Sequence, residues 1–152
     1  MKKIISKTMA MMAVSASILS FSPKTGGEGF EISLNDKIVI QQYGSDMNNV
    51  KSLQLNQTRP NDQLTIKYHH CGKVGKNRVV IIKDGQNNTL KKFNYADVAT
   101  PVAAMTIPVQ DILNLKKSAG STFLKLFYSS SELPSGRILA SIILEQRVTV
   151  QP

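Results

Sequence analysis

The stretch Gln63–Ile82, QLTIKYHHCGKVGKNRVVII, contains two apolar runs separated by a basic segment with two glycines. In the first run, from Leu64 to His70, every second residue is apolar or aromatic, which is typical of a strand with one buried face. The second run, RVVIIK at 78–83, is apolar enough to predict an interior strand that is covered on both sides. Because the loop GKVGKN joins the two runs, the stretch predicts a central hairpin of an all-β fold.

Similar segments recur on both sides of this stretch, and turn signals separate them about every 8 to 12 residues. The clearest turn is DGQNN at 84–88, because Asp, Asn and Gly tolerate a positive φ. One short helix is predicted over 109–117, where Val109, Ile112 and Leu113 have helical spacing. Further strands are expected at 30–34, 37–41, 50–56, 89–95, 124–128 and 137–144, with 147–150 as a possible last edge.

About eight strands without alternating long helices predict an antiparallel two-sheet sandwich of immunoglobulin-like architecture with one short helical turn, rather than a parallel α/β fold. The Cys, Trp and Cys arrangement of true immunoglobulin domains is missing, because the chain has one cysteine and no tryptophan. The architecture by itself therefore implies no function. A single cysteine also rules out an internal disulfide framework and a metal site built from several cysteines.

The N-terminal residues 1–22, MKKIISKTMAMMAVSASILSFS, combine a lysine-bearing start with an apolar run too short to span a bilayer. This pattern predicts a removed signal peptide, whereas a buried helix would need polar residues on one face at helical spacing. Residues 23–29 are then a flexible lead-in, and 30–152 form a single sandwich domain. We expect export to the periplasm or the outside. No cysteine follows the apolar run and no second run reaches membrane length, so neither a lipoprotein nor a transmembrane anchor is expected.

The chain is basic, with 19 Lys and Arg against 10 Asp and Glu and a net charge of +9. Such a balance favours anionic partners such as phosphates, acidic glycans or lipid headgroups, although it also keeps a small protein soluble. The candidate patch for an anion or a partner combines a cluster at one expected strand end with two lysines on the returning strand: Lys73, Lys76, Arg78, Lys91 and Lys92. Nucleic acid is not expected, because the aromatic residues lie in alternating strands as core candidates.

A metal site is the alternative use of the central stretch. On a strand, His69 and Cys71 would project from one face, close enough for an imidazole and a thiolate to bind one Cu(I) or Zn(II) ion. His70 points the other way, toward the expected core. Two ligands make half a site. In blue-copper proteins a histidine and then a methionine follow the cysteine within a few residues, but neither follows Cys71 closely. The competing interpretation is a strand end with a partly buried cysteine and a hydrogen-bonded histidine.

Catalytic motifs are not found in the sequence. The two adjacent histidines point in opposite directions on a strand, and no G-x-S-x-G, H-E-x-x-H or phosphate-binding loop occurs. We therefore predict an exported, non-catalytic binding module without a cofactor. It would recognise a protein partner or an anionic cell-envelope or glycan surface through loops and the basic patch. The alternatives are a periplasmic Cu- or Zn-binding protein that uses His69 and Cys71, and a small hydrolase that uses one histidine.

Overall fold

The computed structural model describes residues 27–55, 58–119 and 123–144. The expected signal peptide at 1–22, most of the lead-in and the possible last edge at 147–150 lie outside these residues. The first strand begins at Glu28, so the last two residues expected in the lead-in belong to the sheet.

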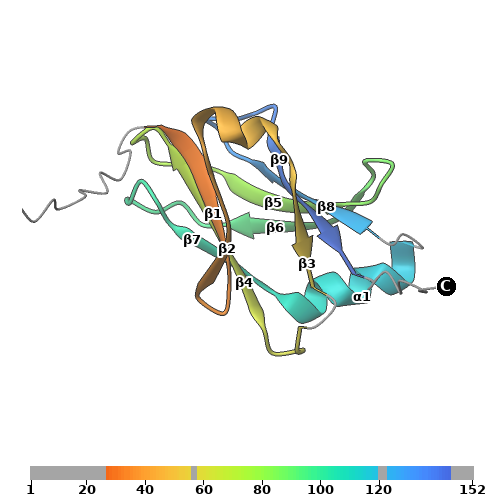
Figure 1. Ribbon diagram of the computed structural model, residues 1–152. Helices are drawn as coiled ribbons and strands as arrows, with labels where there is room; N and C mark the ends of the chain where they lie inside the picture. The colour runs from red at the N-terminus through yellow and green to blue at the C-terminus, as the bar shows by residue number, and fades with distance from the viewer. Residues whose placement is uncertain (1–26, 56–57, 120–122, 145–152) are drawn as a thin grey trace, which may run out of the picture.

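Two sheets pack face to face, as Figure 1 shows. The four-stranded sheet has the order β2-β1-β4-β7 and is antiparallel throughout. The five-stranded sheet has the order β3-β9-β8-β5-β6 and is antiparallel except for the parallel pair β3 and β9. The strands are β1 (Glu28–Leu34), β2 (Lys37–Tyr43), β3 (Lys51–Gln54), β4 (Gln63–His70), β5 (Arg78–Lys83), β6 (Thr89–Tyr95), β7 (Ala104–Pro108), β8 (Phe123–Ser129) and β9 (Arg137–Ile143).

The predicted two-sheet β-sandwich is confirmed, with three differences in detail. The described residues contain nine strands, because β7 forms over residues for which the sequence predicted no strand. The parallel pair was not anticipated, and a short 3-10 helix, η1 (Gly44–Asn48), occupies part of an expected loop. β7 is short and lies at an edge of its sheet, where the Tyr95 hydroxyl donates a hydrogen bond to the Thr106 carbonyl at 3.0 Å. The sequence pattern that would predict such a strand is weak, because only two of its five residues are buried.

The central stretch is not a hairpin, which corrects the prediction made from it. β4 pairs with β1 and β7, whereas β5 pairs with β6 and β8 in the other sheet. The connection at 71–77 therefore crosses from one sheet to the other. Gly75 lies on this crossing, where an added Cβ would lie 3.1 Å from the ring of His70 and from the Arg78 side chain. A hairpin signal is local, and strand partners are chosen by packing over the whole fold.

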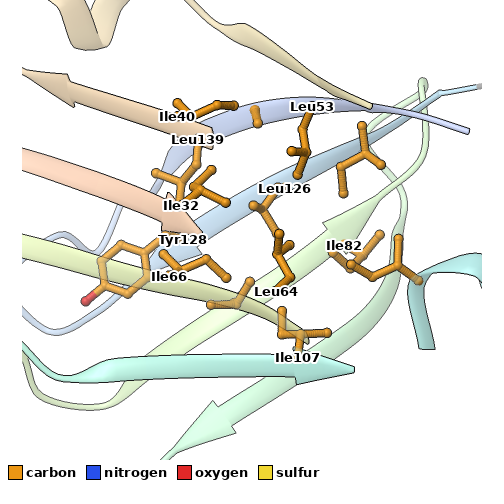
Figure 2. Packing of buried hydrophobic residues seen from close by; sticks show 14 of the residues in the cluster. Ile32, Ile40, Leu53, Leu64, Ile66, Ile82, Ile107, Leu126, Tyr128 and Leu139 are labelled. Carbon is orange, nitrogen blue, oxygen red and sulfur yellow. The ribbon is translucent and has the colours of Figure 1, made fainter. Parts of the chain in front are cut away.

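The core lies between the sheets, where inward side chains of both sheets meet, as the labelled residues in Figure 2 show. In β4 the buried side chains are Leu64, Ile66, Tyr68 and His70, so the expected core side of this strand is confirmed. Leu126 of β8 is fully buried among them, and truncating such a leucine to alanine costs about 2–5 kcal/mol.

Helix α1 (Val109–Ala119) crosses one end of the sandwich and confirms the predicted helix. Its first turn buries Val109 and Ile112, and the Val109 N–H donates to the Asp62 carbonyl at 2.9 Å. Asp111 adds a negative charge to that turn, where the helix dipole favours it, and pairs with Lys91 of β6 at 3.0 Å. The opposite end, where β4, β6 and β8 end and β5 and β9 begin, is called the loop end below.

Candidate functional site

The structure separates His69 from Cys71 in local conformation. Strand β4 ends at His70, and Cys71 follows in an exposed turn with a φ of +53°. The strand alternation that would have put the two side chains on one face therefore stops one residue short of Cys71. His69 instead meets the edge of the Tyr43 ring, with centroids 5.6 Å apart. No group of three or more His, Cys, Asp or Glu side chains that could hold a metal occurs among the described residues. Metal binding by the pair stays a prediction.

The other histidine, His70, is the centre of a buried polar cluster at the loop end. Its Nε2 lies 2.9 Å from the Tyr128 hydroxyl and 3.3 Å from the Ser130 hydroxyl. The Tyr68 ring stacks on Tyr128 at 4.4 Å and tilts against His70 at 4.7 Å. Only 7% of His70 and 5% of Ser130 are exposed. The serine and the histidine are therefore in contact, but both are enclosed in the packing that closes the sandwich.

The electrostatics of this cluster favour neutral groups. Burial lowers the pKa of His70 below its ordinary value, outweighing the attraction of Glu132 and Glu28. Burial also raises the pKa of the Tyr128 hydroxyl and, together with the hydrogen bond to Glu28, that of Tyr68. Glu28 in turn lies 3.5 Å from the Arg137 guanidinium, which ties β1 to β9 across the two sheets. Hydrogen bonds and one ion pair of this cluster join the two sheets, although the buried Nε of Arg137 has no hydrogen-bond partner.

The candidate basic patch is divided between places with different roles. Arg78 is only 6% exposed, and its guanidinium donates to the carbonyls of Ala96 and Ala103 at 2.8 and 3.2 Å. It holds the loop end together rather than facing a ligand. Lys73 and Lys76 are exposed at this end, where the Lys76 backbone N–H donates to the Glu132 carboxylate at 2.9 Å.

Lys91 and Lys92 lie far along the strand from that end. In the β5–β6 pair Arg78 is opposite Tyr95, whereas Lys91 and Lys92 are opposite Ile82 and Ile81. They are three to four residues away, which is about 10–13 Å along a strand. They also project from opposite sides of the sheet, since Ile82 is buried and Ile81 is on the outer side. Lys91 pairs with Asp111, and Lys92 is exposed.

The outer side of the five-stranded sheet is the site that the sequence interpretation missed. Ile81 of β5 lies directly between Lys92 of β6 and Phe127 of β8, and Phe127 is opposite Ile138 of β9. Farther toward the α1 end, Lys83 of β5 is opposite Lys125 of β8, and Phe123 of β8 is opposite Ile143 of β9. Because alternate residues share a side, these outward residues form one surface. This lysine–apolar face consists of Val79, Ile81, Lys83, Lys92, Phe123, Lys125, Phe127, Ile138 and Ile143.

The lysine–apolar face is partly exposed. Val79 and Ile81 are intermediate in exposure, so β5 is interior to its sheet but is not fully covered on both sides as predicted. Phe123 is 42% exposed at the α1 end of the face. Phe127 lies across Gly136, where an added Cβ would come within 2.1 Å of its ring. Contiguous apolar side chains on a sheet exterior are a common mark of an interaction surface.

Charge on the five-stranded sheet has one sign. Its strands carry seven basic residues and no Asp or Glu. Arg78, Lys91 and Arg137 have the partners described above. Lys51 shares its side of β3 with the buried Leu53. The other three, Lys83, Lys92 and Lys125, lie on the outer side. The Lys83 ammonium lies 4.0 Å from the centre of the Phe127 ring, and Lys125 donates to the Gly85 carbonyl and the Asn87 side chain. Neither contact is with a charged group, although Asp84 in the turn after β5 attracts Lys125 electrostatically.

The sequence contains part of the information that defines the lysine–apolar face. The five strand segments can be seen to lack acidic residues once their limits are known. Which lysines share a side, however, depends on the register between strands, and the interpretation grouped Lys91 with Lys92 although the sheet separates them.

Comparison with known proteins adds no assignment, since neither a protein-family model nor a curated protein matches the chain. Among the described residues, no helix has the length and apolar character needed to cross a membrane.

Proposed function

We propose that this chain is an exported, non-catalytic binding module that recognises an anionic partner with its lysine–apolar face. One observation carries the proposal: three lysines share the outer side of a sheet whose five strands contain no acidic residue. A surface of one sign raises the local concentration of opposite charge and speeds its association. The lysine-bearing, apolar N-terminal residues 1–22 support the export part of the proposal.

The contacts of these lysines support binding rather than a structural role. The Lys83 ammonium lies over an aromatic ring, and Lys125 donates to a carbonyl and an amide of the turn after β5. Asp84 in that turn attracts Lys125 electrostatically, which leaves the three lysines with a surplus of positive charge. A phosphate, sulfate or carboxylate of a partner would supply counter-charge for the surplus of positive charge on this side of the sheet.

The loop end supports anion binding less well. Arg78 is committed to two backbone carbonyls, and the Lys76 and Asn77 backbone N–H groups donate to the carboxylates of Glu132 and Asp97. An anion approaching Lys73 and Lys76 would therefore meet carboxylates beside the lysines. Lys92 is the member of the originally expected patch that the proposed face retains.

The test compares two triple variants of equal charge. In the face variant Lys83, Lys92 and Lys125 become Gln, and in the control variant Lys37, Lys67 and Lys73 become Gln. The purified proteins are eluted from immobilised heparin, a polyanion, with a salt gradient. We expect the face variant to elute at clearly lower salt than the control, because screening acts most strongly on the charges that make contact. Equal shifts for the two variants, or no retention of the unmodified protein, would reject the proposal.

A further inference from the structure

We infer that the anionic partner is a lipid surface, against which the lysine–apolar face lies with its lysines at the headgroups and its apolar side chains toward the acyl chains. This inference rests on the proposed function and names the class of partner. It commits to an anionic bilayer leaflet as the occupant of the face.

The apolar part of the face separates a lipid from a purely polar anion. Six of its nine side chains are apolar, and Ile81, Phe127 and Ile138 form a row across three neighbouring strands. A polyphosphate or an acidic glycan would supply charge to the lysines but would leave this row against water. A leaflet supplies phosphates and apolar chains at once, and the gain grows with the apolar area covered.

The lysines are placed as they would be at such a boundary. The Lys83 ammonium lies 4.0 Å from the centre of the Phe127 ring, so a positive charge and an apolar side chain meet on the face. Lys92 and Lys83 flank the apolar row on the strands β6 and β5. Lysines near an anionic leaflet each contribute roughly a fivefold increase in binding.

Other occupants fit the charge and chemistry less well. A second copy of the chain would bring two faces of the same sign together, with no acidic residue in any of the ten strands apposed. A specific protein partner would be oriented by hydrogen bonds at about one per 100–200 Å². The outer side of the sheet offers few groups for that purpose, since its strands carry there, besides lysine, only serines, Gln54, Thr89 and Asn94 as polar residues.

The experiment measures flotation of the protein with vesicles of phosphatidylcholine alone and with vesicles of equal parts phosphatidylcholine and phosphatidylglycerol. We expect binding to the anionic vesicles to exceed that to the neutral ones by at least about tenfold and to fall with salt. The apolar variant combines Ile81→Thr, Ile138→Thr and Phe123→Ser, in which the β-branched threonines keep the strand preference. It should lose at least about tenfold in vesicle binding while its elution from heparin hardly changes.

A matched control removes apolar groups that are equally or more exposed elsewhere. Ile38, Val39 and Val50 are 50%, 42% and 48% exposed and lie outside the face, in β2 and before β3. Changing all three to Thr should leave vesicle binding unchanged. Heparin retention without vesicle binding would overturn the lipid inference and keep the proposed function. If the unmodified protein bound neither heparin nor anionic vesicles, both the proposed function and the lipid inference would be overturned. Vesicle binding that the apolar variant leaves intact would also overturn the inference, as would stronger binding to poly-glutamate than to anionic vesicles, which would indicate an acidic protein.

Discussion

The outer sides of the two sheets differ in how far their side chains satisfy one another. On the four-stranded sheet, Glu31 accepts hydrogen bonds from the Tyr43 hydroxyl at 2.8 Å and the Gln41 amide at 2.9 Å, and the Thr65 and Thr106 hydroxyls lie 3.3 Å apart. On the five-stranded sheet, lysines lie beside apolar groups on strands that contain no acidic residue. Both sheets bury the same kind of core. The difference teaches that two sheets with the same kind of core can have exteriors of different chemistry, one with polar side chains that bond to one another and one with lysines among apolar side chains.

Each exterior also places an aromatic ring within 2.5 Å of where the Cβ of a substituted glycine would lie. Tyr43 lies over Gly29, its neighbour in the β1–β2 register, and Phe127 lies over Gly136 in the turn before β9. The two glycines differ in backbone conformation, since Gly136 has a φ of +67° and Gly29 is an ordinary strand residue. Substituting each glycine by alanine tests how much stability is lost when the ring beside it must move.

The largest effect is expected for Gly136→Ala. The new Cβ would lie 2.1 Å from the Phe127 ring and 2.9 Å from the Tyr128 carbonyl, in a conformation that costs an alanine about 1 kcal/mol or more. We expect the free energy of unfolding in urea to fall by about 2–4 kcal/mol. Gly44→Ala is the control, because Gly44 has a φ of +56° and open space around it, so it isolates the backbone cost. If both variants lost the same free energy of unfolding, the Phe127 ring would be able to move away from the new Cβ at little cost.

Gly29→Ala is expected to cost less, about 1–2 kcal/mol. Its Cβ would lie 2.0 Å from the Tyr43 ring, but that ring stands at the edge strand and can swing into solvent, giving up its hydrogen bond to Glu31. A double-mutant cycle with Tyr43→Ala measures the contact, because Gly29→Ala should cost little once the ring is gone. A cost that persists in the Tyr43→Ala background would place the strain in the backbone of β1.

These local contacts were largely invisible in the sequence, although the coarse fold was readable. Alternation in β4 predicted the sandwich and the buried side of His70, and helical spacing predicted α1. Both signals come from neighbouring residues, so they survive without knowledge of partners. The division of β4 and β5 between two sheets is a long-range choice, and no residue in the connecting loop encodes it alone.

The candidate site was predictable only in part for the same reason. Lysines on β6 could be found in the sequence, but the side that each one faces follows from the register and the bulges of the sheet. Arg78 resembled a surface charge because it begins a strand beside a basic loop, yet its guanidinium turns inward to two carbonyls. Burial of a charged group is decided by acceptors that come from elsewhere in the chain.

Acid should weaken the exterior of the four-stranded sheet through Glu31. Burial would raise the pKa of this carboxyl, but the hydrogen bonds from Tyr43 and Gln41 and the charges of His69 and Lys67 together hold it below 4.5. A carboxyl with a lowered folded-state pKa contributes stability above its unfolded value, and this contribution is lost as the pH falls through the folded value. Tyr43→Phe should therefore cost about 0.5–1.5 kcal/mol near pH 7 and less near pH 3, as measured by urea unfolding at each pH. A cost that does not change with pH would separate the Tyr43 hydroxyl from the ionisation of Glu31.

The smallest effects on stability are expected on the lysine–apolar face. Lys83→Gln removes an ammonium from the Phe127 ring, a contact worth about 0.5–1 kcal/mol at an exposed site. Lys92→Gln removes the same charge from an exposed position and should change stability by less than about 0.5 kcal/mol. Urea unfolding of both variants near pH 7 measures the difference. A loss above about 2 kcal/mol in either would mean that these lysines hold the sheet together. Small losses would mean that the five-stranded sheet tolerates these charges without needing them, which is the behaviour expected where a surface is kept for a partner.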